Sequence, residues 1–145
     1  MSELLDRLAR EGINPTSYRL DTIGGGAGQD DCLCLRRSGS TWDVSRLERG
    51  SHEILAFFAT EADACEDLFA RLDGDPASRS HLLAWFGERA KADAFVALLH
   101  DAGITPNHRD VSVTHSGSRH RIFVDGRDLA AATLLLRRHA GGASA

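Results

Sequence analysis

The feature that most constrains the fold is one helix-ending pattern that occurs twice, at an offset of 91 residues. "LLDRLAREGINP" begins at Leu4, and "FVALLHDAGITP" begins at Phe95. In each segment apolar residues recur at helical spacing, and a Gly-Ile pair and a proline follow. A glycine at that place favours the left-handed backbone that ends many helices, and the isoleucine can fold back onto the last turn. Two helices that end in the same way are therefore predicted.

A second correspondence predicts a hairpin in each half. Ser-Gly-Ser separates two alternating runs at 37–41 ("RSGST") and again at 115–119 ("HSGSR"). Alternation of apolar and polar residues predicts strands, and the short Gly/Ser break predicts a turn. A helix then closes each half, the first after Thr60, which is a good N-cap followed by acidic residues. Further strands are expected at "SYRLDT", "HEILAFF" and "HLLAWF".

These elements predict an α+β fold in which helices cover an antiparallel sheet, built as two related helix–strands–helix halves. With 145 residues, of which 42% are hydrophobic, the chain is expected to form a single domain over 1–140. Its halves are expected at about 1–72 and 81–139, joined by "DGDPASRS". The tail at 141–145, "GGASA", is expected to be disordered.

Charge is divided unevenly along the chain. The net charge of -4 argues against a general nucleic-acid binder, which needs a basic surface. Residues 1–75 contain 8 Arg and 15 Asp+Glu, a charge of -7, whereas residues 76–145 contain 9 Lys+Arg and 6 Asp+Glu, a charge of +3. An acidic half can steer a basic partner, although such acids are equally typical of ordinary solvated helix surface.

Three features predict a cytoplasmic protein with no membrane partner. The first residues, "MSELLDRLAREG", contain acids and lack the apolar core of a signal peptide. No run approaches the roughly 20 apolar residues that cross a bilayer. The three cysteines are an odd number, which argues against a disulfide framework.

Several motifs contain residue types that also occur in chemical sites, and each favours a structural interpretation. "GGGAG" at 24–28 precedes a strand and lacks the Lys-Ser/Thr of a phosphate loop, so a flexible connection is expected. Cys32 and Cys34 point to one strand face without a second Cys/His pair, which favours small buried hydrophobes. No serine lies in a Gly-x-Ser-x-Gly elbow. The remaining group is His108, His115 and His120 with Asp110. Such residues could bind a metal or transfer protons, but the spacing does not place a third ligand.

From these observations we expect no catalytic residue, no metal and no cofactor, and a protein that is not an enzyme. A less favoured alternative is a metal-dependent enzyme that uses the His108–His120 region. A small ligand-sensing or adaptor domain, which would dimerise through its sheet, also stays open. The sequence does not indicate the oligomeric state.

The stretch "TWDVSRLERGSHEILAFF", which begins at Thr41, carries a family resemblance. Its alternating strand stops at Glu-Arg-Gly and resumes as an apolar strand ending in Phe, and "TEADAC" follows from Thr60. This pattern of Trp-x-Val, Glu-Arg-Gly and Thr-Glu-x-x-Ala-Cys resembles immunity proteins of bacterial polymorphic toxin systems. The resemblance covers roughly residues 1–72 and is looser in the second half. It implies a small cytoplasmic α+β protein that binds a cognate toxin domain and blocks it by occlusion.

The resemblance and the acidic first half together predict which residues contact the partner. Toxin domains are often basic at the active-site face, so an acidic face can occlude them. An exposed Trp42 would be a natural hot spot, whereas core packing is the alternative for this residue. Glu48 can contact the partner, or it can instead form an ion pair with Arg49 within the turn. The predicted partner-binding residues are Asp30, Asp31, Trp42, Glu48, Glu53, Glu61, Asp63 and Glu66.

Overall fold

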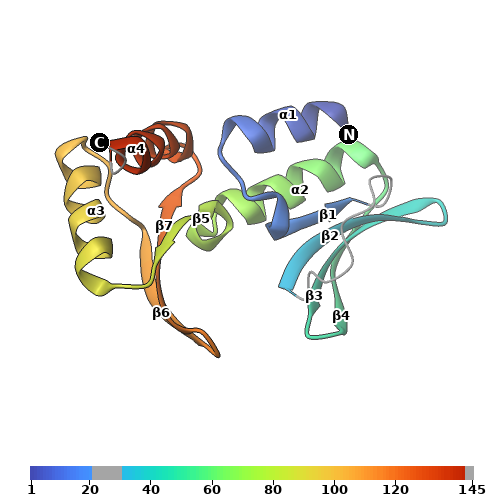
Figure 1. Ribbon diagram of the computed structural model, residues 1–145. Coiled ribbons are helices and arrows are strands. Elements are labelled where there is room, and N and C mark those ends of the chain that lie inside the picture. Colours follow the sequence, from blue (N-terminus) through green and yellow to red (C-terminus); the bar gives the residue numbers. More distant parts are fainter. Residues whose placement is uncertain (21–30, 143–145) are drawn as a thin grey trace. The chain divides into compact units, whose positions relative to one another are not determined.

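The computed structural model describes residues 1–20 and 31–142 (Figure 1). The chain divides into two compact units, Met1–Ser78 and Arg79–Ala145, where the sequence predicted one domain with two halves. Each unit has helices and a sheet of its own, and the strand pairs are antiparallel except for one. The predicted α+β class is therefore confirmed. The predicted glycine connection at 24–28 and Asp30 lie outside the described residues.

The first unit places two helices on one face of a four-stranded sheet. The strand order is β1-β2-β3-β4, with β1 parallel to β2 and the other neighbours antiparallel. Its elements are α1 (Ser2–Arg10), the 3₁₀ turn η1 (Pro15–Ser17), β1 (Tyr18–Leu20), β2 (Asp31–Ser38), β3 (Thr41–Glu48), β4 (Ser51–Phe58), α2 (Glu61–Asp73) and the 3₁₀ turn η2 (Pro76–Arg79).

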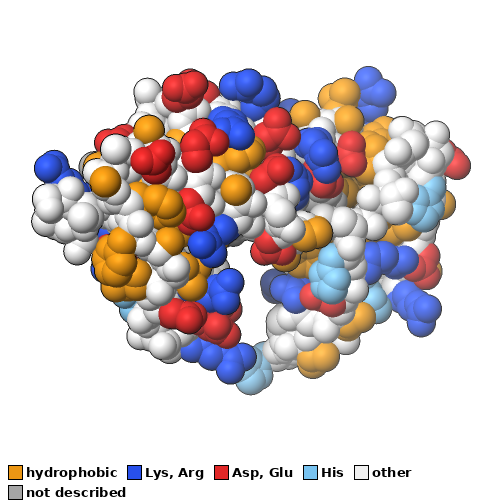
Figure 2. Space-filling model, turned by 180° about the vertical axis from the view of Figure 1, so that it is seen from behind, with side chains coloured by type: hydrophobic (Ala, Val, Ile, Leu, Met, Phe, Trp, Pro, Cys, Tyr) orange, Lys and Arg blue, Asp and Glu red, His pale blue; other side chains and the backbone are white. Residues whose placement is uncertain are grey.

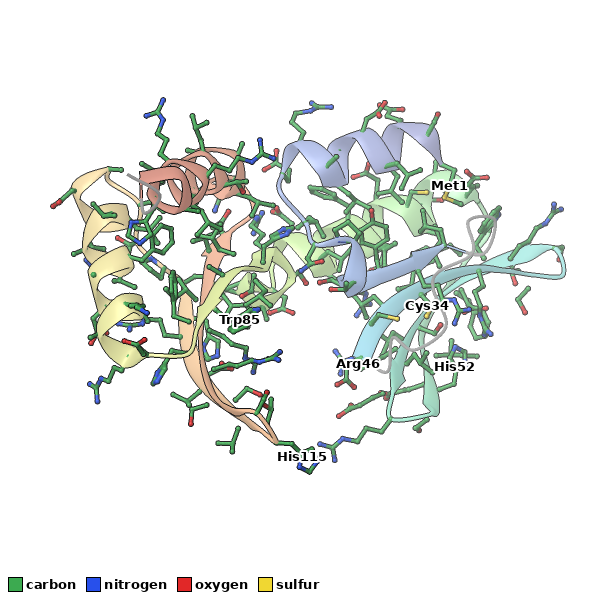
Figure 3. All side chains as sticks on the ribbon, in the orientation of Figure 1. Met1, Cys34, Arg46, His52, Trp85 and His115 are labelled. Atoms are coloured by element: carbon green, nitrogen blue, oxygen red, sulfur yellow. The ribbon has the colours of Figure 1, made fainter. Side chains whose placement is uncertain are left out.

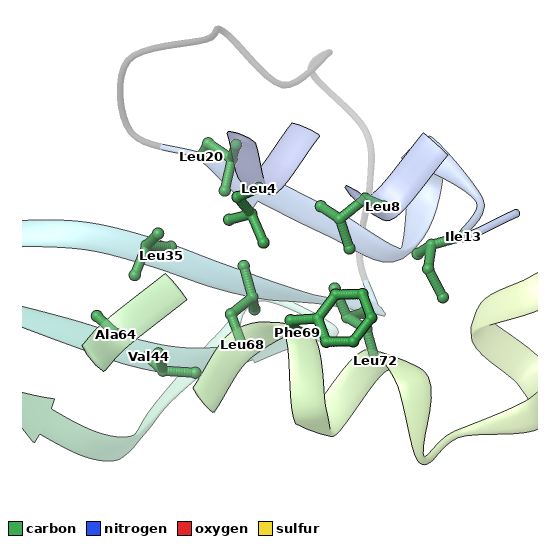
Figure 4. Close-up of a cluster of buried hydrophobic side chains, with 10 residues drawn as sticks. All are labelled: Leu4, Leu8, Ile13, Leu20, Leu35, Val44, Ala64, Leu68, Phe69 and Leu72. Atoms are coloured by element: carbon green, nitrogen blue, oxygen red, sulfur yellow. The ribbon is translucent and has the colours of Figure 1, made fainter. Parts of the chain in front are cut away.

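The core of this unit lies between the helices and the sheet (Figure 4). Leu8 of α1, Leu35 of β2 and Leu68 of α2 have no exposed surface. Burying such a side chain away from water stabilises the folded state by about 1.5–3 kcal/mol. Because strand side chains alternate between faces, the packing of Leu35 and Val44 in one core with helix residues determines which residues of β2 and β3 face the helices.

The second unit has the elements β5 (Ser80–Phe86), α3 (Arg89–Asp101), β6 (His108–Thr114), β7 (Gly117–Asp125) and α4 (Leu129–Gly142). The strand order is β5-β7-β6, and both pairs are antiparallel. Phe95 and Leu99 of α3 pack with Ile122 of β7 in its core. Helix α4 includes the first two residues of the tail that was expected to be disordered, and residues 143–145 lie outside the described part.

Both predicted helix ends are confirmed. Gly12 and Gly103 have positive φ angles of 69° and 77°. The Ile13 amide donates to the Leu8 carbonyl at 2.9 Å, and the Ile104 amide makes the equivalent bond at 2.8 Å. A bond that spans six residues, next to a left-handed glycine, is the Schellman ending, which satisfies carbonyls that the helix itself leaves free.

The two hairpins are not equivalent, so the predicted repeat is incomplete. Ser38 pairs with Thr41 as predicted, but Thr114 pairs with Gly117, which makes His115 and Ser116 the second turn. His120 pairs with Val111, roughly 10 Å along the strand from that turn at about 3.4 Å per residue. His115 and His120, which were grouped as a potential site from the sequence, therefore lie apart on this hairpin. The second unit also begins with a strand, β5, which has no counterpart in the first unit.

Candidate functional site

Three of the predicted acids share one face of the first unit's sheet. Asp31, at the start of β2, pairs with Glu48 at the end of β3, and Arg46 pairs with Glu53 of β4. Paired residues of antiparallel strands point to the same face, and so do residues two apart on one strand. Leu33, two residues from Asp31, packs against the core, so this is the face that the helices cover. We call Asp31, Glu48 and Glu53 the acidic sheet end.

These carboxylates are exposed and lack partners among the described residues. No ion pair or side-chain hydrogen bond joins Asp31, Glu48 or Glu53 to another described residue. Like charges directly opposite each other on neighbouring strands destabilise a sheet, on the scale of about 0.2–1 kcal/mol per cross-strand pair. The register of the strands therefore places two like charges opposite each other at this end of the sheet, and Arg46 lies two residues from Glu48 on the same face.

A cavity of about 510 Å³ lies beside the acidic sheet end. Asp31 and Glu48 line it together with Asp75 and two arginines, Arg46 and Arg71. Arg71 is already paired with Asp67 at 2.6 Å, whereas Arg46 has no ion pair with a described carboxylate. The cavity has the size of a site that holds one side chain or one small molecule.

The predicted acids of α2 lie elsewhere and have partners within the unit. Glu61 pairs with the N-terminal ammonium group at 2.8 Å, and Glu66 accepts hydrogen bonds of 2.8 and 2.9 Å from Arg7. Thr60 accepts a bond from the Asp63 amide, which confirms the predicted cap, and its hydroxyl donates to the Asp63 carboxylate at 2.7 Å. Acidic and basic side chains are interspersed around α1 and α2 (Figure 2). The predicted contact residues therefore form two groups rather than one acidic face.

Trp42 and the Glu-Arg-Gly turn have structural surroundings. Trp42 is half-buried and packs against the core of the first unit, where it pairs with Phe58. Among residues 1–20 and 31–142, no ion pair involves Glu48 or Arg49. The turn instead depends on backbone conformation, because Arg49 and Gly50 have φ angles of 49° and 80°. Two consecutive left-handed residues form the tight turn that matches the twist of a β-hairpin.

One polar pair was not foreseen from the sequence. Ser45 of β3 and His52 of β4 lie on the sheet face away from the helices, with Oγ and Nε2 2.8 Å apart (Figure 3). This is the distance expected between a nucleophile and its base. The side chain of Ser45 has no exposed surface, however, so the bond satisfies a buried hydroxyl. The register that pairs Ser45 with Ile54 and Leu47 with His52 places the two side chains on one face, and no sequence motif predicts it.

The cysteines behave as predicted. Cys32 and Cys34 are buried with their sulfur atoms 3.9 Å apart, and both are free thiols. Burial, followed by the neighbouring Cys32, raises the pKa of the Cys34 thiol to about 11. At neutral pH this thiol is protonated, which suits a small hydrophobic side chain and not a metal ligand or nucleophile.

The histidine region of the second unit is organised around an ion pair. Arg121 donates two hydrogen bonds of 2.6 Å to Asp110, and His108 lies 3.3 Å from the same carboxylate. The bond from Arg121 is the main reason that the pKa of Asp110 lies below its usual value. Within residues 1–20 and 31–142, no three His, Cys, Asp or Glu side chains are grouped to hold a metal ion.

Comparison of the chain with protein-family models, with curated proteins and with solved structures gives no match. In the described part of the chain, none of the helices has the length and apolar character needed to cross a membrane. The acidic sheet end and its cavity are therefore interpreted from their own geometry.

Proposed function

We propose that this chain is an immunity protein, which binds a cognate bacterial toxin domain and neutralises it by occlusion, with no catalytic step of its own. The observation that supports this most directly is the pair of exposed carboxylates, Asp31 and Glu48, which face each other and form no ion pair with another described residue. A toxin with a basic active-site face supplies the missing charge. The resemblance of residues 1–72 to such immunity proteins agrees with this assignment.

The cavity has a lining that suits a cationic side chain of a partner. A lysine or arginine side chain of the toxin enters beside Asp31 and Glu48, where each carboxylate can accept a charge-assisted hydrogen bond. Such bonds are roughly twice as strong as neutral ones, and the relief of carboxylate repulsion adds to them. A toxin cation that is held here is withdrawn from its own substrate, so binding and neutralisation are one event.

The test is co-expression of the chain with the toxic product of the neighbouring gene, scored by growth and by co-purification. We expect the wild-type chain to restore growth and to form a stable complex. The double variant Asp31→Lys, Glu48→Lys should lose both properties because it presents two cations to a basic face. The control variant is Asp6→Lys, which makes the same kind of charge change at an exposed position of α1.

Each outcome has a distinct meaning. Rescue by the wild type and by Asp6→Lys, with failure of the double variant, supports the proposal at this site. Rescue by all three proteins would keep the function but remove the acidic sheet end from it. Absence of rescue and of a complex with the wild-type chain would refute the proposed function.

The cavity also favours a second candidate function, a small ligand-sensing domain. Its volume of about 510 Å³ falls within the range of small-molecule sites, and three carboxylates against two arginines favour a cationic ligand. Thermal unfolding in the presence of arginine, putrescine and spermidine, with no protein partner, distinguishes the two functions. A saturable rise in Tm that the Asp31→Lys variant lacks would favour the ligand-sensing function.

A further inference from the structure

The sheet of the second unit has one face that its helices do not cover. Ile122 and Val124 of β7 are buried in the core, so the alternate residues Arg119, Arg121 and Phe123 point to the opposite face. The strand register adds neighbours from both sides of β7 to this face. The aromatic–arginine face is defined by Leu82, Trp85, His108, Arg119, Arg121 and Phe123.

This face exposes large apolar side chains in a fixed arrangement. Trp85 is 52% exposed and Leu82 is 49% exposed. Trp85 points away from α3 (Figure 3), and the Arg119 guanidinium carbon lies 4.4 Å from the centre of its ring. The rings of His108 and Phe123 are 5.2 Å apart. Rings and guanidinium groups that hold one another in place lose little conformational freedom when a partner binds.

The charges of this face leave one cation without a counter-charge. Arg121 is bound by Asp110, and Arg127, at the end of β7, is bound by Asp125. Arg119 has no ion pair with a described carboxylate, and its contact is with the Trp85 ring. An occupant of the face is therefore expected to bring a carboxylate to Arg119.

The composition of the face is that of a protein–protein contact. Trp, Phe and Arg are enriched in the centres of interfaces, and Trp85, Phe123 and Arg119 lie on this face. Asp110 lies on it too, where Arg121 binds it. A nucleic acid fits less well, since it requires the neutralisation of several phosphates, and of the two arginines of this face Arg121 is already paired with Asp110. The exposed Leu82 beside Trp85 likewise calls for an apolar side chain rather than a phosphate.

We infer that the aromatic–arginine face is a second docking surface for the toxin, and that it receives a segment with a carboxylate beside an apolar side chain. The inference rests on the proposed function. The carboxylate pairs with Arg119, and the apolar side chain packs on Trp85 and Leu82. An occupant that offers only one of these two groups is disfavoured, because it leaves either Arg119 or the apolar pair unmatched.

The test measures the affinity of the full-length chain for the purified toxin domain by calorimetry at one fixed salt concentration. Trp85→Ala should weaken binding about thirtyfold, as expected for a hot spot. Arg119→Glu should weaken it at least about tenfold, because the charge that faces the carboxylate is reversed. Leu82→Glu is compared with a matched control, Leu134→Glu on α4, since both leucines are 49% exposed. Only Leu82→Glu should weaken binding.

Folding of each variant is checked by circular dichroism and thermal unfolding. Arg119→Lys provides a milder change, because lysine keeps the charge but loses the planar stacking on Trp85. It should bind with an affinity between those of the wild type and Arg119→Glu. This graded series separates loss of a contact from loss of the fold.

Three results would overturn the inference. If the wild type binds and Trp85→Ala and Arg119→Glu stay within about twofold of it, the face is not a docking surface and the proposed function stands. If the wild-type chain binds no toxin, the inference and the proposed function both fail. If a 15-nucleotide oligo(dT) or oligo(U) binds the chain and Trp85→Ala abolishes that binding, the face belongs to a nucleic acid.

Discussion

Reversal of one charge at the acidic sheet end should stabilise the fold and weaken the proposed complex. Glu48 pairs with Asp31 across β2 and β3. Side chains so placed have Cβ atoms about 4.5–5.5 Å apart. At roughly 5.5 Å in water, two unit charges interact with about 0.75 kcal/mol. Glu48→Lys replaces repulsion by attraction, so the change in this interaction energy is about twice that value.

The expected gain is smaller, because both side chains are flexible, solvated and screened by salt. We expect the free energy of unfolding to rise by about 0.5–1 kcal/mol. The first unit spans 78 residues, for which about 1 kcal/mol corresponds to a rise in Tm of roughly 4–8 °C. The assay is thermal unfolding at low and at high ionic strength. The gain should be largest at low salt and fall towards zero in about 1 M NaCl, where the Debye length is about 3 Å.

The same variant should bind the toxin about tenfold more weakly, since a cation now faces a basic partner. Asp6→Lys, the control in α1, should change neither quantity by a comparable amount. A Glu48→Lys protein that unfolds at a lower temperature at low salt would refute the reasoning, because no repulsion would then exist to be relieved. Opposite signs for stability and affinity are expected of a surface arranged for binding rather than for stability.

Three further predictions concern other parts of the chain. Arg49→Asn should raise the free energy of unfolding by about 0.5–1 kcal/mol in urea titrations, because asparagine adopts the left-handed conformation of φ 49° at less cost than arginine; an unchanged or lower midpoint would contradict this. The hydrogen bond from Arg121 lowers the pKa of Asp110, so its contribution to stability is present above the unfolded pKa of about 3.9 and is lost as pH falls through the folded value. Asp110→Asn should therefore flatten the acid limb of a stability–pH profile, and a profile identical to the wild type would exclude this role. Cys34, whose pKa is raised to about 11 by burial, should resist alkylation by iodoacetamide at pH 8 until the chain is unfolded, as mass spectrometry of the labelled peptides would show; rapid labelling of the native protein would contradict its burial.

Local chemistry made the elements of this protein predictable. The helices and strands of the α+β class depend on residues within a few positions of each other. The same holds for the helix ends at Gly12 and Gly103 and for the cap at Thr60, so a local sequence pattern is enough to predict them. The burial of Cys32 and Cys34 was predicted in the same way, from the alternation of a single strand.

The candidate sites depend on strand pairings, which a local sequence pattern does not predict. The sequence predicted eight contact residues without indicating which share a surface, and the register of β2, β3 and β4 brings Asp31, Glu48 and Glu53 together. Glu61 and Glu66 lie on α2, where the Met1 ammonium group and Arg7 pair with them.

The division into two units and the aromatic–arginine face were also decided by tertiary structure. Trp85 belongs to a strand that the sequence predicted, but its exposure depends on the sheet order β5-β7-β6 and on which face the helices cover. Side-chain periodicity determines that a strand has two faces, whereas only packing against helices decides which of them stays open to a partner.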